Sequence, residues 1–595
     1  MKKNKGKSFI LTKKSRLYLS VSAITIVFFL LIIRLFYLMV IEHSNLSNKA
    51  NEQWTNEIKI DARRGKILDR NNLDLAVSAN VYRVDLDLKT LREDEFNRKV
   101  SIKDITKKLA NILNLKEDII SQKLNAKLPS GQLANSTTLA RRIEKEPANE
   151  IKALKLRGII ISQDTKRYYV NNNLLSHVLG FTDADGQGLS GVELKYNKEL
   201  SGIPGMRISE VDRRNDSLPY CESTFTPPIN GKDLILTIDE RLQNIADKYA
   251  EKALIDNKAK STTIIMMDPK NGEVLALANK PDFNPNSPYE GYEKFDGKNN
   301  FDKLQQMWRN FAVSNAFEAG SIFKVLTSIA ALEEGVAGGN ETYYCPGYKK
   351  YPNVGRPVHC WKHSGHGIQT FVKTLENSCN VAFMDIGAKL GKERLNKHLK
   401  ELGLGQLSGI DLPGETKGIV KPCSEMSDMD IGTIAFGQTD TLNIMQYMAA
   451  FNAIANNGTW IQPHVMKDIS HIDSNGQRVI DENFKPKTKI VASEEKTKQL
   501  REYLRKVVSE GSAKCANVPG LSIGGKTGTA EKVSNGTYGD KKIATFAAMA
   551  PTDNPKLTLL ILINEPSGGE YFGGLIAAPI AKPVLEEAFN YLSLK

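Results

Sequence analysis

Ser321 and Lys324 stand three residues apart, a spacing that can produce an activated nucleophile. If this stretch opens a helix, both side chains share one face, and the ammonium lies about one turn from the hydroxyl. A serine hydroxyl is a weak nucleophile until a neighbouring base takes its proton. A buried lysine can be that base, because desolvation lowers its pKa. The apolar spacing of residues 325–332 predicts a buried helix, with Ser321 at its N-terminus.

The same spacing occurs once more where it has an ordinary explanation. Ser493 and Lys496 lie in a charged segment that is typical of a solvated helix. A serine at the start of such a helix is a cap and has no catalytic role. The chemistry proposed for Ser321 therefore depends on further residues elsewhere in the chain.

Ser378 and Asn380 offer a hydroxyl and a carboxamide two residues apart. In a tight turn both side chains can point into one cleft, where Ser378 could relay a proton and Asn380 could hold a substrate amide. The pair is weak evidence by itself, because Ser78 and Asn80 have the same spacing.

A glycine-rich segment around Lys526 allows two interpretations. The run from Gly520 to Thr527 fits a phosphate-binding loop, but such a loop must lead into a helix, and here a turn-rich stretch follows. We therefore predict an exposed strand, where Gly528 lets the backbone approach a ligand and Lys526 attracts a carboxylate. Thr527 and Thr529 would point to the same side of this strand.

Hydrophobic periodicity around these residues predicts an α+β fold with a mostly antiparallel sheet. The best linker candidate is Pro227–Gly231. Strands are expected at 233–238, 263–268, 274–278, 544–550 and 557–564, and helices at 102–115, 144–156, 239–255, 444–455 and 577–594.

The N-terminus predicts a membrane anchor. Residues 1–16 carry seven lysines and arginines, and residues 17–41 carry Arg34 as their single charge. This length suits one transmembrane helix, and the basic flank predicts a cytoplasmic N-terminus with everything after Glu42 exported. Arg34 could reach the outer interface or face a partner helix. The alternative is a cleaved signal peptide, for which the apolar run is long and no clear small-residue cleavage site follows.

Composition limits the function classes. The 595 residues exceed one typical core, so at least two globular domains are expected. The net charge is +13, but the lysines are spread along the chain. This argues against nucleic-acid binding and favours attraction to an anionic membrane or cell wall.

The six cysteines are Cys221, Cys345, Cys360, Cys379, Cys423 and Cys515. None forms a C-x-x-C pair, so the sequence predicts no zinc site. Cys345 and Cys360 lie fifteen residues apart in a turn-rich stretch that can fold back as a hairpin, so a disulfide between them is one possibility in an exported chain. The alternative is two buried thiols. Cys379 lies inside the Ser378 turn and is expected to stay a thiol.

With S-x-x-K, S-x-N and K-T-G in this order, the chain resembles penicillin-binding proteins and serine β-lactamases. Two positions depart from the family pattern: Val170 and Ala319 replace prolines. Most of the exported part is similar to class B penicillin-binding proteins, at Arg64–Arg70, Gly188–Glu193, Arg309–Val313, His366-Gly367, Asp411–Glu415, Gly437-Gln438, Tyr571–Gly574 and Ala577–Pro579.

The resemblance implies a domain order in which an elongated pedestal carries a transpeptidase. We expect a cytoplasmic tail at 1–16, a transmembrane helix at 17–41, a dimerisation-like pedestal at 42–228 and a transpeptidase domain at 229–595. It also implies β-lactam binding, and partnership with a membrane glycosyltransferase and other cell-wall machinery through the helix and the pedestal.

The implied activity is D,D-transpeptidation of peptidoglycan stem peptides, without metal or cofactor. By resemblance Ser321 attacks the D-Ala–D-Ala carbonyl, Lys324 is the base, and Ser378 and Lys526 pass the proton to the leaving amine. Asn380 would bind the substrate amide. Backbone N–H groups of Ser321 and Thr529 would form the oxyanion hole, and the K-T-G strand, with Thr527, Gly528 and Thr529, would bind the terminal carboxylate.

Other functions use the same residues. A β-lactamase would need a water-activating group and rarely carries a pedestal; a D,D-carboxypeptidase differs only in its acceptor; and a β-lactam-binding scaffold would have lost catalysis. Within the class, Ala435–Gln438 leans towards septal and sporulation enzymes, with side-wall elongation as the alternative.

Overall fold

The computed structural model describes residues 13–47, 55–97, 99, 101–210, 224–352, 354–534 and 537–593. Most of the predicted cytoplasmic tail and Cys221 lie outside these residues. The chain forms two compact units, residues 1–62 with 203–230, and residues 63–202 with 231–595. Residues 63–202 thus belong to the same compact unit as the C-terminal part of the chain. The predicted boundary between the pedestal and the transpeptidase domain, at residue 228, stays a prediction.

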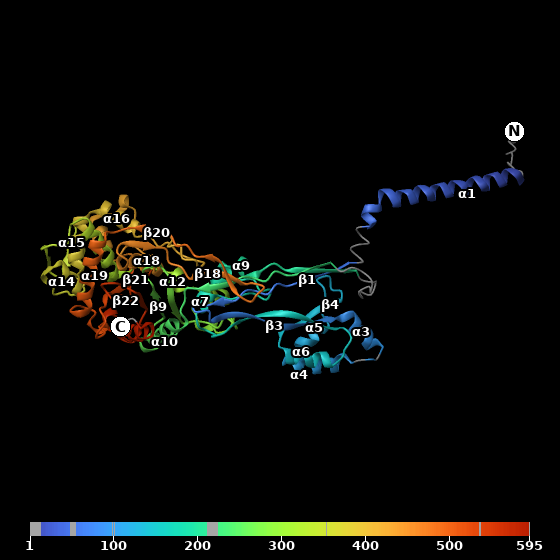
Figure 1. Ribbon diagram of the computed structural model, residues 1–595, viewed down its shortest axis with the longest axis horizontal. Helices are drawn as coiled ribbons and strands as arrows, with labels where there is room; N and C mark the ends of the chain where they lie inside the picture. The colour runs from blue at the N-terminus through green and yellow to red at the C-terminus, as the bar shows by residue number, and fades with distance from the viewer. Residues whose placement is uncertain are drawn as a thin grey trace, which may run out of the picture. The chain divides into compact units, whose positions relative to one another are not determined.

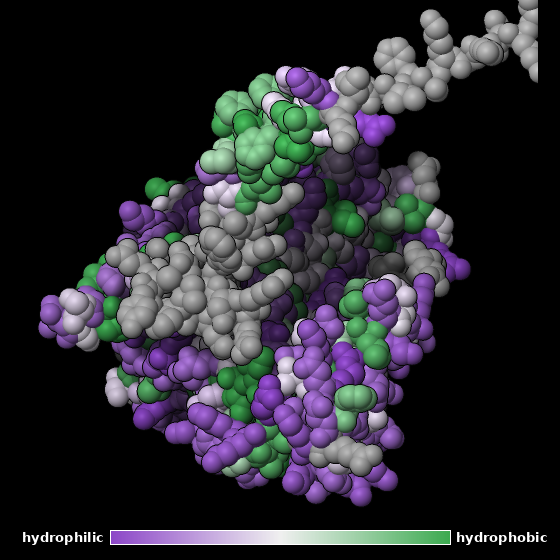
Figure 2. All heavy atoms as spheres, turned by 90° about the vertical axis from the view of Figure 1, so that its right-hand side faces the viewer, coloured by the Kyte–Doolittle hydropathy of each residue, from purple (hydrophilic) through white to green (hydrophobic). Residues whose placement is uncertain are grey.

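The first unit contains the predicted apolar helix. Helix α1 (Lys13–Phe36) continues as the π-helical turn η1 (Tyr37–Ile41). Within the described residues, Lys14–Ile41 is the one helix long and apolar enough to cross a membrane. Its hydrophobic side chains are exposed, and they form the green group in the upper part of Figure 2. The unit also has an antiparallel sheet of β1 (Thr55–Ile60), β6 (Gly205–Glu210) and β7 (Thr224–Thr226).

The second unit is built on an antiparallel five-stranded sheet with the order β10-β9-β23-β22-β21. Strands β9, β10 and β23 are buried along their whole length, which explains their continuous apolar runs. The α+β fold class is therefore confirmed. The strands are β9 (Ser261–Met267), β10 (Val274–Lys280), β21 (Gly524–Ser534), β22 (Thr537–Ala550) and β23 (Leu557–Asn564).

Helices cover this sheet, and Figure 1 shows it between α10 and α18. Asp239 caps α10 as predicted, because its carboxylate accepts from the N–H groups of Arg241 and Leu242. Edge strand β21 packs beside α19 and beside the short turn η3. The helices are α10 (Glu240–Asp256), α13 (Lys324–Glu333), α18 (Ile444–Ala455), α19 (Glu494–Ser509) and α21 (Ala578–Leu592), and η3 is Gly320–Phe323.

A second, mixed sheet joins residues 63–202 to later strands in the order β19-β18-β8-β2-β3-β4, with β5 also on β3. The predicted strand at 233–238 is confirmed as β8, but it pairs with β2 and β18 and so belongs to this sheet. The strands are β2 (Ile67–Leu68), β3 (Asp74–Asp87), β4 (Ser136–Ile143), β5 (Ile159–Tyr169), β8 (Asp233–Leu236), β18 (Met466–Ile472) and β19 (Arg478–Asn483).

Part of this unit has a separate small core. Both helices predicted between residues 102 and 156 are present as α4 and α6, and they pack with strand residues of β3 and β4. The helices of this core are α3 (Leu88–Phe96), α4 (Ile102–Leu113), α5 (Glu117–Leu124) and α6 (Lys145–Ala153).

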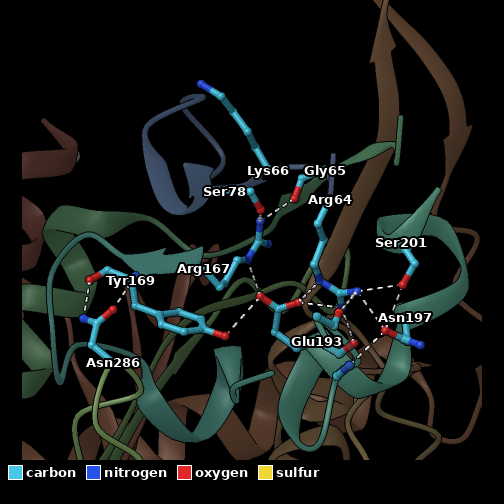
Figure 3. Close-up of polar contacts among 12 residues, drawn as sticks. Arg64, Gly65, Lys66, Ser78, Arg167, Tyr169, Glu193, Asn197, Ser201 and Asn286 are labelled. Atoms are coloured by element: carbon cyan, nitrogen blue, oxygen red, sulfur yellow. Dashed lines mark hydrogen bonds and ion pairs between the residues drawn. The ribbon is translucent and has the colours of Figure 1, made fainter. Parts of the chain in front are cut away.

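A buried ionic cluster fixes the start of β2 to the segment that follows β5 (Figure 3). Glu193 is fully buried and accepts from the Nε atoms of Arg64 and Arg167, both at 2.7 Å. Arg167 also donates to the carbonyl oxygen of Gly65 at 2.7 Å. Burial alone would raise the pKa of the Glu193 carboxyl, but the two guanidinium groups hold it below its usual range.

Short elements complete the second unit. Those before Ser321 are α7 (Ser176–Leu179), α8 (Gly191–Lys195), α9 (Asn197–Ser201), η2 (Tyr292–Lys294), α11 (Asn300–Trp308), α12 (Phe311–Ser314) and β11 (Ala316–Phe317). Those after it are β12 (Thr342–Cys345), β13 (Tyr348–Lys349), β14 (Val358–His359), β15 (Gly367–Thr370), α14 (Phe371–Glu376), α15 (Asn380–Leu390), α16 (Lys392–Glu401), η4 (Cys423–Glu425), α17 (Asp428–Ala435), β16 (Leu442–Asn443), β17 (Thr459–Ile461), β20 (Thr488–Ile490), η5 (Lys514–Ala516) and α20 (Gly573–Ile576).

Candidate active site

Ser321 is the second residue of the 3₁₀ turn η3, and this turn leads directly into α13, whose first residue is Lys324. The predicted α-helical N-terminus is thus a tighter turn. Because side chains three residues apart eclipse in a 3₁₀ turn, Lys324 Nζ comes within 3.0 Å of Ser321 Oγ. The turn also packs closely on β21, since a Cβ on Gly320 would meet the carbonyl oxygen of Thr529 at 2.8 Å.

Lys324 is completely buried, although its amine reaches several polar groups. Besides Ser321, Nζ donates to the carbonyl oxygen of Ser378 at 2.8 Å and to Asn380 Oδ1 at 2.7 Å. Burial lowers the pKa of Lys324 to about 8, since no carboxylate is among these partners. A part of the amine is therefore neutral near physiological pH, as a base requires.

The turn at residues 378–380 aims its hydroxyl at both lysines. Ser378 has a φ of 52°, a left-handed conformation that is uncommon for a residue with a Cβ. Its Oγ accepts from Lys526 at 2.8 Å and from Lys324 at 3.3 Å. Asn380 starts α15, and Cys379 is the N-cap residue, whose sulfur accepts from the N–H of Ala382.

Lys526 comes from the edge strand β21 and is also completely buried. Burial and the nearby ammonium of Lys324 lower its pKa well below the usual range. On the same strand, Gly528 has no room for a side chain, because a Cβ would meet Thr545 Oγ1 at 2.3 Å and Ile322 at 3.1 Å. The glycine thus lets β21 lie against the turn that carries Ser321.

Five of the seven side chains predicted to act at the site contact one another, and two do not. Ser321, Lys324, Ser378, Asn380 and Lys526 form one hydrogen-bonded network. Thr527 and Thr529 are next along the predicted strand, but their hydroxyls contact other groups. Thr527 Oγ1 lies 3.4 Å from Ser512 Oγ, and Thr529 Oγ1 accepts from the N–H of Gly573 at 3.0 Å.

The second S-x-x-K sequence is a helix cap. Ser493 Oγ accepts from the N–H of Lys496 at the start of α19, and the ammonium of Lys496 pairs with Glu495. The two occurrences differ in burial, since Lys324 is inaccessible to solvent while the side chain of Lys496 is 33% exposed.

Sequence reasoning missed how the cysteines are arranged. The hairpin between Cys345 and Cys360 is present as β13 and β14, and of the two alternatives for these cysteines the structure has the two buried thiols. Both are free thiols, as are the other cysteines that the structure describes. Their sulfurs share one small space with Cys379 and His366, so neither has the other as its sole partner.

Comparison with known proteins gives the family. Residues 262–586 match the penicillin binding protein transpeptidase domain, and residues 59–236 match the penicillin-binding protein dimerisation domain. The chain is 35% identical to stage V sporulation protein D of Bacillus subtilis, over 96% of this chain and 84% of that protein. It is 30% identical to the peptidoglycan D,D-transpeptidase FtsI of Escherichia coli K12, over 94% of this chain and 89% of that protein.

A solved structure agrees in fold. Penicillin binding protein 3 of Mycobacterium tuberculosis, complexed with aztreonam, aligns over 90% of this chain and 97% of its own, with a TM-score of 0.65 at 24% identity. The chain belongs to the class B penicillin-binding proteins, as the resemblance along most of its exported part implied.

Proposed function

We propose that this protein, a serine-type peptidoglycan D,D-transpeptidase, cross-links stem peptides through an acyl-enzyme on Ser321. The observation that carries the proposal is the network in which Lys324 joins Ser321 to Ser378, and Ser378 joins Lys324 to Lys526. It connects a hydroxyl nucleophile to two buried amines without any carboxylate, so the lysines are available as proton carriers.

Acylation begins when neutral Lys324 takes the hydroxyl proton of Ser321. The Oγ atom then bonds to the carbonyl carbon of the penultimate D-Ala, and the amide C–N bond to the terminal D-Ala breaks. The proton returns through Ser378 and Lys526 to the leaving nitrogen, so D-Ala departs as a neutral amine. Every proton and bond in this step is thus accounted for by the stem peptide's own atoms and by Ser321, Lys324, Ser378 and Lys526.

Deacylation reverses the same path with a different amine. A side-chain amine of a neighbouring strand bonds to the ester carbon, the bond to Ser321 Oγ breaks, and the amine proton returns to that oxygen. With water as the acceptor the product would be a shortened peptide, which is the D,D-carboxypeptidase alternative.

The strand β21 would bind the substrate beside the nucleophile. The backbone N–H groups of Ser321 and Thr529 would stabilise the oxyanion, since Thr529 lies against the η3 turn. Thr527, Gly528 and Thr529 would hold the terminal carboxylate, and Asn380 the substrate amide. The same groups would accept a β-lactam, as the solved complex of a family member with aztreonam illustrates.

The cellular role follows from the anchor and the relatives. The basic residues before α1 favour a cytoplasmic N-terminus and an extracytoplasmic catalytic domain. The relatives named for stage V sporulation and as FtsI favour septal wall synthesis over side-wall elongation. A membrane glycosyltransferase and other cell-wall proteins are the partners that the helix and the pedestal would contact.

Labelled penicillin tests the nucleophile. The full-length protein in detergent should form a covalent adduct, Ser321→Ala should lose it, and Ser493→Ala should keep it as the matched S-x-x-K control. An adduct that persists without Ser321 would refute the assignment. A fluorescent fusion in the native host tests the role, since a mid-cell band supports septal synthesis and a patchy side-wall pattern supports elongation.

A further inference from the structure

A groove lies beside α11, outside the candidate active site. It consists of two cavities with volumes of about 500 and 710 Å³, which is a size typical of ligand sites. The cavities adjoin, because they share four lining residues, which are His177, Gln305, Gln306 and Arg309. None of the residues proposed for the chemistry at Ser321 lines either cavity. The two cavities together are called the α11 groove below.

The first cavity has an aromatic wall. The ring of Trp308 lies 5.0 Å from that of Phe181 and 5.5 Å from that of Tyr289, measured between centroids. The indole N–H of Trp308 donates to the carbonyl oxygen of Pro288 at 2.7 Å, so the ring is held in one orientation. Phe181 is buried, but Tyr289 is 55% exposed, and the wall is therefore accessible from solvent. An aromatic cluster that served only the core would be closed to solvent.

Polar groups surround this wall. The side chains of Gln305, Gln306 and Arg309 are exposed and offer amide and guanidinium donors. Ser190 also lines the cavity, and its buried hydroxyl has no hydrogen-bond partner among the described residues. A buried hydroxyl without a partner is unfavourable, and a hydrogen-bonding ligand would relieve this. The first cavity thus combines fixed aromatic rings with several donors.

The second cavity has a cationic lining. Four lysines and one arginine line it, with Asp296 and Asp302 as its acidic residues. Two of the lysines are paired with aspartates. The other three cations, which are Lys294, Lys298 and Arg309, are exposed and pair with no carboxylate in the part of the chain that the structure describes. This end of the groove therefore attracts an anionic group.

We propose that the α11 groove binds a glycan segment of peptidoglycan, through a sugar ring and the carboxylates of its stem peptide. The apolar C–H face of a pyranose would pack on Trp308 and Tyr289, whose ring faces carry partial negative charge. Hydroxyl and acetamido groups of the sugar would bond to Gln305 and Ser190, and the peptide carboxylates would meet Lys298 and its neighbouring cations. This second site deepens the proposed transpeptidase function, on which it rests.

The groove and the cleft lie at opposite edges of the five-stranded sheet. Asn279 and Lys280, which line the groove, end β10, whereas Lys526 is on β21. Four strand spacings of about 4.8 Å separate these edges, or about 19 Å. A single sugar unit cannot fill both places, so a strand of several sugars would be held by the groove and the cleft together. The groove would thereby keep a polymeric substrate near Ser321 and lower its KM.

Calorimetric titration tests the groove. The ligand is N-acetylglucosaminyl-N-acetylmuramyl tripeptide, which lacks D-Ala–D-Ala, and the full-length protein in detergent is first treated with penicillin to block the cleft. Wild-type protein should bind this disaccharide saturably, and Tyr289→Ala and Lys298→Ala should each weaken binding about tenfold. Phe96→Ala and Lys270→Ala are the matched controls and should bind like wild type, because both side chains are exposed and lie outside the groove.

A change in the ligand makes the test independent of folding. The same disaccharide with its peptide carboxylates amidated should bind wild-type protein about tenfold more weakly, because the cations of the groove lose their counter-charge. Absence of binding to wild-type protein, or equal weakening by Phe96→Ala and Lys270→Ala, would overturn the proposal. So would binding of poly(glycerol phosphate) in place of the disaccharide, which would assign the groove to a different anionic polymer.

Steady-state kinetics separates the groove from the proposed function. With isolated, uncross-linked glycan strands as the substrate, Tyr289→Ala and Lys298→Ala should raise KM several-fold, whereas Lys270→Ala should keep the wild-type KM. A lower kcat at an unchanged KM would overturn the role of the groove, because the effect would then lie in the chemistry at Ser321. If wild-type protein forms neither a penicillin adduct nor cross-links, the proposed function fails, and binding of the disaccharide to untreated protein still decides whether the groove is a glycan site.

Discussion

Two buried charged clusters in the same unit are built in opposite ways. Around Glu193, two guanidinium groups surround a carboxylate at 2.7 Å, and the charges compensate each other. Around Ser378, the amines of Lys324 and Lys526 share one hydroxyl, and their other partners are the hydroxyl of Ser321 and carbonyl and amide oxygens. The first arrangement stabilises charge and therefore structure. The second leaves two cations uncompensated, which lowers their pKa values and suits them to proton transfer.

The largest expected effect concerns the base. Lys324→Met keeps most of the buried stem but removes the amine, so the rate of acylation by labelled penicillin should fall about 10²–10⁴-fold. The denaturation temperature should stay constant or rise, because an uncompensated buried amine is replaced by an apolar group. Stopped-flow acylation and a thermal melt on the same preparation check both statements. A collapse of the melt would show that Lys324 is structural, like the arginines around Glu193.

A change in the cluster around Glu193 should lower stability and leave acylation nearly unchanged. Glu193→Gln leaves Arg64 and Arg167 buried without a counter-charge, which should cost about 3–5 kcal/mol of stability. The denaturation temperature should drop, while protein still folded at low temperature should acylate at nearly the normal rate. Glu144→Gln is the control, because Glu144 makes an exposed contact with Lys166 and should matter little. A selective loss of acylation in Glu193→Gln would contradict the comparison.

Lys526 should behave like Lys324, with a smaller effect. In Lys526→Ala the proton path through Ser378 is broken, but Lys324 can still activate Ser321. We expect acylation to slow by about 10²-fold, at the lower end for a general acid–base group, with little change in the thermal melt. A large drop in melting temperature without a specific loss of acylation would identify a structural lysine.

The smallest expected effect is a pH dependence. Burial brings the pKa of Lys324 down to about 8, and the neutral amine is the active form. The rate of acylation should therefore rise as pH is raised from neutral through about 8 and then level off. A rate profile of wild-type protein, with a thermal melt at each pH, would show it. A rate that falls over this range would mean that the ammonium, and not the amine, assists Ser321.

Much of this candidate site could be predicted from the sequence, because each proposed catalytic side chain lies on a short element with a local pattern. The i, i+3 spacing of Ser321 and Lys324 and the strand character of β21 both required only neighbouring residues. The left-handed conformation of Ser378 was not predictable, since it depends on contacts with lysines from two distant elements.

Long-range pairing set the limit of the prediction. The strand at β8 was found, but its place in the mixed sheet depends on β2 and β18, which come from far along the chain in both directions. The cysteines show the same limit. Pairwise spacing suggested that Cys345 and Cys360 could bond to each other, whereas the fold adds His366 and Cys379 to the same space.

The most direct test of the account is the position of the penicillin adduct in unaltered protein. Digestion of the labelled chain and tandem mass spectrometry should place the label on Ser321, in the peptide that joins η3 to α13. One adduct per chain at that residue is the predicted result. A label on Ser378, on Ser493 or on a buried cysteine would contradict the assignment of Ser321 as the nucleophile. It would also contradict the proposed role of Lys324 and Lys526 in proton transfer.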